Sequence, residues 1–174
     1  MLENMRGNGG HSQEIIIYKQ KALSSIANND NVLKAINAKN TKGKPLSMEE
    51  LYYTHLFPYG FIPETIEEAG CYVCVEVSMP QVSTKNYFFK EVLLVVTIIC
   101  HQGVLRMTKD EPLGSTGANR MDYIGVEIDK LFNGRTDMGY GELDLVSNIE
   151  GAVDIVHRYR TLRFAATENK KSFC

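Results

Sequence analysis

The sequence is short of the features that mark several protein classes. It contains no tryptophan, four cysteines and five prolines, and its nearly balanced charges give a net charge of −2 over 174 residues. Proteins that hold DNA electrostatically usually carry a basic excess, so this balance argues weakly against tight nucleic-acid binding. The longest apolar run, Val92 to Cys100, is far shorter than the roughly 20 residues of a membrane-spanning helix. We therefore expect no membrane partner.

Signals for secretion and catalysis are also missing. The first residues, MLENMRGNGGHSQ, have no apolar stretch behind a positive charge, so they do not form a secretory signal. Four cysteines without an export signal predict free thiols in a reducing cytoplasm. No GxSxG, HExxH, phosphate-loop or Rossmann glycine pattern occurs, and Gly114–Gly117 lacks the lysine of a phosphate loop. We expect no enzymatic activity, no cofactor and no metal ion.

The composition is that of one globular domain. Hydrophobic residues make up 44% of the chain and charged residues 23%, and the length allows a real core. Gly and Asn near the start predict a flexible leader over residues 1–13. A single domain is expected over residues 14–167, followed by a polar tail over 168–174.

Helical spacing is clearest after Asn119. Apolar residues recur three and four positions apart at Met121, Ile124, Ile128 and Leu131. Asn119 is suited to cap the start of this helix, and Asn133-Gly134 to end it. Earlier helices are predicted around Ile15, Ile16, Leu23 and Ile26, then after a cap at Asp30 with Val32, Leu33 and Ile36 facing inward, and after a capping box at Ser47–Glu50.

Strand patterns occupy the middle and the end of the chain. Cys71 to Met79 alternates between apolar and other side chains, which is typical of a half-buried strand. Tyr87 to His101 is apolar on both faces, so we expect a central strand with helices on one face and other cover, such as a neighbouring subunit, on the second. Two closing strands are predicted at 141–148 and 154–167. The fold class is therefore α/β of the α+β kind, with a mainly antiparallel sheet of four to five strands and helices packed on one face.

Two segments invite a chemical interpretation. Cys71-x-x-Cys74 resembles a redox or zinc motif, but alternation along a strand puts the two side chains on opposite faces, where buried cysteine acts as a small apolar residue. A zinc site would also need Cys100, His101 or a remote group. Asp122, Glu127 and Asp129 scatter around the last helix, and we interpret them as a solvated polar face.

The densest basic run is His157-Arg158-Tyr159-Arg160 with Arg163. One interpretation is that Arg158, Arg160 and Arg163 contact phosphates inside a ring through which DNA passes, or make charge contacts between subunits. The other is ordinary cross-strand pairing with Glu142 and Asp144. The long segment Gln102 to Ala118 shows no periodicity, which is typical of a binding loop or contact arm.

Three segments together resemble small neck proteins of tailed bacteriophages, of the tail terminator or tail-completion type. They are HLFPYGFIPETIEEAGCYVCVEV, LLVVTIICHQGVL and NRMDYIGVEIDKLFNG, the last followed by GELDLV and the HRYRTLRFAAT strand. Arg120, Asp122, Ile124 and Ile128 match an R-x-D-x-I-type run within this pattern. The similarity covers most of residues 46–167.

This resemblance implies a structural virion protein at the head-proximal end of the tail, assembled in the host cytoplasm. It implies a homo-oligomeric ring, typically a hexamer, that terminates the tail tube and joins it to the head connector. Its partners would be tail tube and head–tail connector proteins, with transient contact to passing genomic DNA. Alternatives are another head–tail connector or head-completion ring, a small nucleic-acid-binding regulator using the basic strand, and a metal or thiol enzyme using Cys71 and Cys74.

Overall fold

The structure, a computed structural model, describes residues 11–36, 46–60, 69–82, 90–139 and 141–167. Five strands form one sheet in the order β1-β2-β3-β5-β4. Their bounds are β1 Leu56–Phe57, β2 Cys71–Val82, β3 Lys90–His101, β4 Glu142–Ala152 and β5 His157–Thr167. Only β1 and β2 run parallel, and every other neighbouring pair is antiparallel. The expected mainly antiparallel α+β fold is confirmed.

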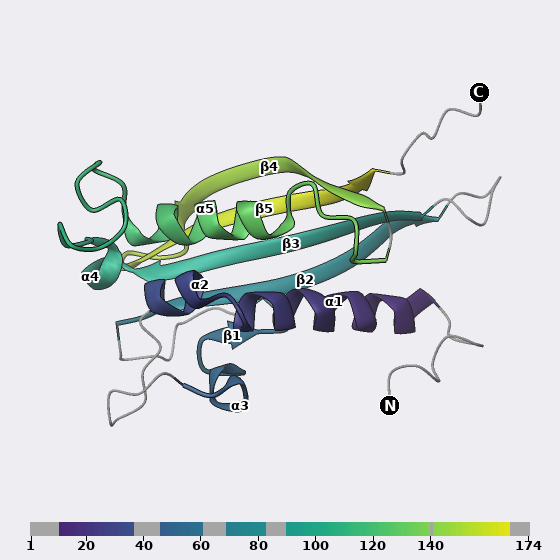
Figure 1. Cartoon of the computed structure of the whole chain (residues 1–174), viewed down its shortest axis with the longest axis horizontal. Coiled ribbons are helices and arrows are strands. Elements are labelled where there is room, and N and C mark those ends of the chain that lie inside the picture. Colours follow the sequence, from purple (N-terminus) through teal and green to yellow (C-terminus); the bar gives the residue numbers. More distant parts are fainter. Residues whose placement is uncertain (1–10, 37–45, 61–68, 83–89, 140, 168–174) are drawn as a thin grey trace.

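Helices cover one face of this sheet (Figure 1). They are α1 (His11–Ala27), α2 (Asp30–Ala35) and α5 (Arg120–Phe132), with the shorter α3 (Met48–Leu51) near β1 and α4 (Gln102–Leu105) at the end of β3. The main core lies between helices and sheet, because alternate residues of β2, β3 and β5 point toward the helices. Phe132 of α5 and Phe164 of β5 are fully buried there, with ring centroids 5.7 Å apart.

The capping signals around α5 and α3 form as the sequence predicts. The Asn119 side chain accepts the Asp122 amide proton at 3.0 Å, and the Asp122 carboxylate accepts the Asn119 amide proton at the same distance. Gly134 follows α5 with a φ of 77°, a left-handed conformation that glycine adopts without strain. Ser47 and Glu50 form the predicted capping box of α3.

Several boundaries differ from the prediction. The cap of α2 is Asn29 rather than Asp30, since its side chain accepts the amide protons of Asn31 and Val32. α1 begins at His11, so residues 11–13 are helical, and the rest of the expected leader and the tail lie outside the described residues. Ile16 is 56% exposed, whereas Leu23 and Ile26 are buried as predicted. The segment after β3 is not wholly irregular, because α4 opens it.

The long apolar strand is central, as predicted. β3 pairs with β2 on one side and β5 on the other, with two strands on each side of it in the sheet order. Its helix-facing residues Leu94, Val96 and Ile98 are completely buried. The second face, which we call the open face, carries Leu93, Val95 and Thr97 of β3, all half-buried. The long helices pack against the opposite face (Figure 1), and on the open face Tyr72, Cys74 and Ile99 are nevertheless buried at 1–4% exposure.

A disulfide joins Cys71 of β2 to Cys100 of β3. The two residues are direct partners across the antiparallel pair, and their Cα atoms lie 4.2 Å apart. The expectation of free thiols is therefore wrong for both residues, because the strand register places them side by side on the helix-facing side. Cys74 is a buried cysteine on the open face that takes no part in the disulfide.

Candidate functional site

Arg160 of β5 is the centre of a charge network on the helix-covered side. Its guanidinium donates to the Asp122 carboxylate at 2.6 Å, to the Glu150 carboxylate at 2.5 Å and to the Asn148 side-chain oxygen at 2.8 Å. The Arg160 side chain is only 18% exposed. A guanidinium held by two carboxylates is neutralised, so Arg160 is not free to contact a phosphate.

The Arg160 side chain runs close beneath α5. A Cβ atom at Gly125 would lie 2.8 Å from Cδ of Arg160, so glycine at this position permits the close approach. Beside it lies a small cavity of about 130 Å³, lined by Asp122, Gly125, Val126, Asp129, Asn148 and Arg160. Two buried polar atoms of its lining, Oδ1 of Asp129 and Nε of Arg160, have no hydrogen-bond partner. A cavity of this size with polar walls can hold a few water molecules.

The predicted pairing of the arginines with Glu142 and Asp144 is wrong. Because of the register between β4 and β5, Glu142 lies opposite Thr167 and Asp144 opposite Ala165. The residue opposite Arg160 is Glu150, which the sequence analysis did not single out. The sequence could have indicated this pair, because extending the predicted strand 141–148 to Ala152 would have placed Glu150 in the sheet.

The three arginines do not form one surface. Arg158 and Arg160 share the helix-facing side of β5, whereas Arg163 lies on the open face with His157, as strict alternation requires. Arg158 and Arg163 are both exposed, opposite Ala152 and Ser147. A single patch of three phosphate-binding arginines is therefore absent from the described part of β5.

The acidic residues of α5 are not simply a solvated face. Glu127 is buried at 6% exposure and accepts hydrogen bonds from the Asn31 side chain at 2.9 Å and the Lys130 ammonium at 2.8 Å. The bond from Lys130 is the main reason that the pKa of the Glu127 carboxyl is lowered. Our interpretation failed because α2 packs against α5 and covers Glu127. Glu127 thus joins two helices.

The cysteine and histidine residues that the structure describes show no arrangement for metal chemistry. Cys71 is in a disulfide, and Cys74 is on the opposite face, as the alternation predicts. Within the described ranges, no three His, Cys, Asp or Glu side chains are placed to hold a metal ion. His157 is buried, and its Nδ1 lies 2.8 Å from an Asp154 carboxylate oxygen. This contact lowers the pKa of Asp154 and holds the turn between β4 and β5.

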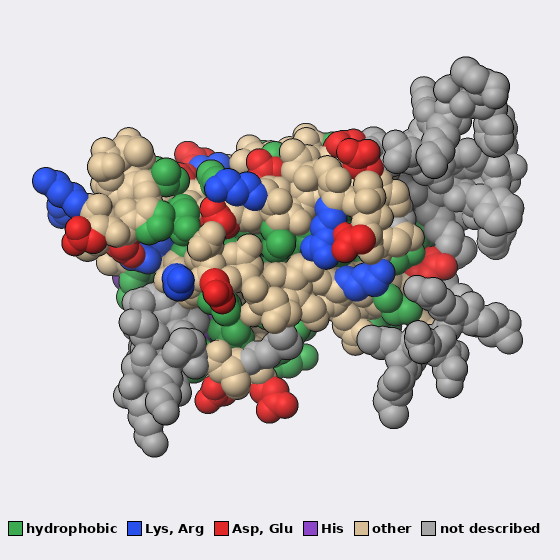
Figure 2. Space-filling view, in the orientation of Figure 1, with side chains coloured by type: hydrophobic (Ala, Val, Ile, Leu, Met, Phe, Trp, Pro, Cys, Tyr) green, Lys and Arg blue, Asp and Glu red, His purple; other side chains and the backbone are tan. Residues whose placement is uncertain are grey.

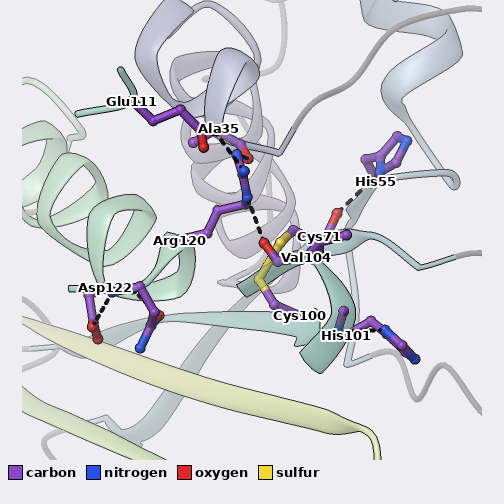
Figure 3. Close-up of a disulfide and its surroundings, with 11 residues drawn as sticks. Ala35, His55, Cys71, Cys100, His101, Val104, Glu111, Arg120 and Asp122 are labelled. Carbon is purple, nitrogen blue, oxygen red and sulfur yellow. Dashed lines mark hydrogen bonds and ion pairs between the residues drawn. A yellow bond between two sulfur atoms is a disulfide. The ribbon is translucent and has the colours of Figure 1, made fainter. Parts of the chain in front are cut away.

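Arg120 ties the segment after β3 to the body of the protein (Figure 3). Its guanidinium donates to the carbonyl oxygens of Ala35 at 3.0 Å and Val104 at 2.8 Å, and forms an ion pair of 2.7 Å with Glu111. The Arg120 side chain is 12% exposed. This residue therefore joins α2, α4 and the loop that precedes α5, and we call it the Arg120 clamp.

Replacing Glu111 by glutamine is expected to loosen the loop that precedes α5. It should also remove the dependence of the stability of this loop on pH. The Thr108 amide, followed by Arg120, lowers the pKa of the Glu111 carboxyl below its ordinary 4.5. The stabilisation is thus complete above that value and is lost as the pH falls through the lowered pKa. The Thr108 amide donates to Glu111 at 2.7 Å, so its NMR shift should follow this titration.

The exposed neighbour Asp110 supplies the control for this experiment. Asp110→Asn should leave the acid titration of the Thr108 amide unchanged, whereas Glu111→Gln should abolish it. A Thr108 amide that titrates equally in both variants would contradict the assignment of Glu111 as the group that orders the loop.

The two faces of the molecule differ in character. On the helix-covered face, acidic and basic side chains are interspersed (Figure 2). The open face carries a small buried cluster of Phe57, Tyr72, Cys74 and Ile99, with half-buried apolar residues of β3 beyond it. At the edge, β4 exposes Val146 and Ile149, at 56% and 50%. Half-covered apolar area beside an edge strand is a typical place for contact with another chain.

Comparisons with known proteins identify a family. None of the helices that the structure describes is both long and apolar enough to cross a membrane. Neither the curated proteins nor the solved structures contain a significant match to the chain. The family model of YomW matches residues 29–166, which is well over half of the sequence and covers all five described strands apart from Thr167 at the end of β5. The chain therefore belongs to the YomW family, a family associated with bacteriophages.

Proposed function

We propose that this protein is a structural component of the virion of a tailed bacteriophage, located at the neck. Copies of the chain form a ring, typically a hexamer, that terminates the tail tube and joins it to the head connector. The protein acts by assembly, without catalysis or cofactor, and is assembled into the particle in the host cytoplasm. The observation that carries this proposal is the open face, a half-buried apolar surface on a member of a phage-associated family.

Two further surfaces suit contacts in a ring. β4 is an edge strand whose exposed Val146 and Ile149 offer apolar area to a neighbour. The loop between α4 and α5 presents Leu113, which is 38% exposed, on a backbone with a positive φ of 63°. The Arg120 clamp holds the base of this loop. An ordered loop loses little conformational freedom on binding, which favours a contact role.

The charge arrangement is compatible with a conduit for DNA. Arg160 is neutralised by Asp122 and Glu150, and the net charge of the chain is −2. A wall that binds phosphate strongly would slow the passage of a genome. Transient contact at Arg158 or Arg163, which are exposed, remains part of the proposal.

The test is to add the purified protein to growing tail tubes and to image the products by electron microscopy. We expect a ring at one end of each tube and tubes that stop growing. Tubes of unchanged length without rings would contradict the proposal. A ring that binds the head connector but not the tube would instead favour the alternative of another head–tail connector or head-completion protein.

The second candidate, a nucleic-acid-binding regulator, is favoured only by the exposed Arg158 and Arg163. It predicts an affinity for duplex DNA that falls steeply with salt and is lost when both residues are changed to alanine. Absence of binding at low salt would remove this candidate.

A further inference from the structure

Two exposed tyrosines lie at the edge of the sheet that β1 forms. Tyr53 is 64% exposed and Tyr59 is 46% exposed, and their ring centroids are 6.2 Å apart. Tyr59 also meets Phe57, a buried residue of β1, edge to face with a centroid distance of 5.8 Å. Ring contacts of this kind hold the exposed side chains in place. We call Tyr53 and Tyr59 the tyrosine pair.

The backbone places Tyr53 on the outer side of β1. Leu56 of β1 pairs with Val73 on its inner side and forms a bridge to Tyr52. The amide of Tyr53 donates to the carbonyl oxygen of Leu56 at 2.9 Å. Tyr53 has a φ of 62°, a left-handed conformation that is rare for a bulky side chain. Strained residues gather at functional contacts, and tyrosine is enriched at the centres of interfaces.

The opposite edge of the sheet is aliphatic. β4 is the last strand on that side, and it exposes Val146 by 56% and Ile149 by 50%. The chain itself covers the first part of this edge, because Leu143 donates to the carbonyl of Arg135 and accepts from the amide of Gly134. The exposed apolar part of β4 lies beyond this covered segment.

The strand register brings the two edges to the same level. One row of paired residues runs from Phe57 of β1 through β2, β3 and β5 to Ile149 of β4. The next row on the open face holds Glu76 of β2 and Arg163 of β5, on either side of Val95. The apolar residues of the two edges therefore lie beside charged residues of one common row.

Each edge carries one exposed charge of this row, and the two charges are opposite. Glu76 lies beyond the end of β1, and a Cβ atom at Gly60, next to Tyr59, would be 3.5 Å from its carboxylate. Arg163 lies opposite the small Ser147 of β4, so its long side chain can reach past that strand. The two edges are thus complementary in charge.

From this arrangement we propose that the tyrosine pair of one copy packs against Val146 and Ile149 of the next copy in a ring. The two surfaces differ and lie on opposite edges, so the contact repeats head to tail and can close. A rotation axis parallel to the middle of β3 keeps each row at its level and brings Glu76 of one copy toward Arg163 of the next. The contact rests on the proposed ring and specifies the surfaces that form it.

Side chains make this contact, rather than a backbone ladder shared between two sheets. Neighbouring strands twist by about 20–25°, so the two edges of a five-stranded sheet cross at about 80–100°. Aromatic rings against β-branched side chains are a favourable combination. The tyrosine pair is already held by Phe57, so it loses little freedom on binding.

The first test is native mass spectrometry of the full chain at micromolar concentration, with one edge blocked at a time. Tyr53→Asp and Ile149→Asp should each reduce the ring at least tenfold and leave monomers. Their equimolar mixture should form dimers and nothing larger, since only one intact contact remains, from β4 of one variant to the tyrosine pair of the other. Aspartate accepts the left-handed conformation at position 53 more readily than tyrosine, so the fold is retained.

An exchange of charges tests the same contact independently. Glu76→Arg and Arg163→Glu should each reduce the ring at least tenfold, because each places like charges at every contact. A double variant with both substitutions in one chain should form rings again. The matched controls are Arg158→Glu, exposed on the other side of β5, and Ile16→Asp, exposed on α1. Both should form rings like the wild type.

Four results would overturn the inference: a monomeric wild type, rings that survive both aspartate substitutions, a mixture that closes into rings or stays monomeric, or a double charge variant that does not recover. Rings that stop tail tubes but ignore these substitutions would refute the contact alone. Rings that depend on these residues but neither bind nor stop tail tubes would refute the proposed function alone.

Discussion

Replacing Arg160 by alanine is expected to lower the free energy of unfolding by about 2–3 kcal/mol. Loss of one partner from a buried ion pair typically costs about 3–5 kcal/mol, and partial exposure reduces that figure. The Arg160 side chain is 18% exposed and that of Asp122 is 28% exposed. The substitution also leaves Asp122 and Glu150 close together without a counter-charge. Urea unfolding measures the change.

The other two arginines of β5 provide matched controls. Arg158 and Arg163 are exposed, so their replacement by alanine should change stability by less than about 0.5 kcal/mol. The comparison separates a structural arginine from two surface ones on the same strand. If Arg160→Ala were as stable as the controls and instead abolished DNA binding, the phosphate-contact interpretation of this residue would be correct.

Removing the disulfide is expected to have the largest effect on stability. Cys71 and Cys100 are separated by 29 positions. Closing a loop of that length restricts the unfolded chain, and the chain-entropy model gives a stabilisation of about 3.5 kcal/mol. The double variant Cys71→Ala/Cys100→Ala should therefore unfold at a clearly lower urea concentration than the oxidised protein.

The wild-type protein under reducing conditions is the first control for this prediction. Its unfolding midpoint should fall toward that of the double variant, since reduction removes the same cross-link. Cys74→Ala is the second control, because Cys74 is equally buried but takes no part in the disulfide. Identical midpoints for oxidised wild type, reduced wild type and double variant would show that the cross-link contributes nothing.

Features fixed by local physics were predictable from the sequence. The cap at Asn119 and the left-handed Gly134 define α5 because both signals act within one turn of the helix. The period-two pattern of β2 and the apolar character of β3 correctly predicted two strands, with β3 central in the sheet. The expectation that β2 is half-buried is wrong for its first half, because Cys71 to Val75 are buried on both faces. These patterns depend on spacing along the chain and not on which strands become neighbours.

The errors concern partners that are distant in the sequence. The disulfide and the Arg160–Glu150 pair both depend on strand register, which no local pattern reports. Glu127 was taken as solvated because its own helix gives no sign that α2 covers it. The cluster at Arg160 therefore became visible only once α5, β4 and β5 were placed together.

The proposed ring needs contact surfaces on the outside of the chain, and two candidates lie apart from the Arg160 network. One is the edge strand β4, which exposes Val146 and Ile149. The other is the loop whose base the Arg120 clamp holds.

Native mass spectrometry of the purified full-length chain tests the central claim most directly. If the protein works by assembly with copies of itself, the spectrum at micromolar concentration should show a closed ring, typically of six copies. The ring should become more abundant when tail tubes are added. A spectrum that contains only the 19.6 kDa monomer, with and without tubes, would contradict the account.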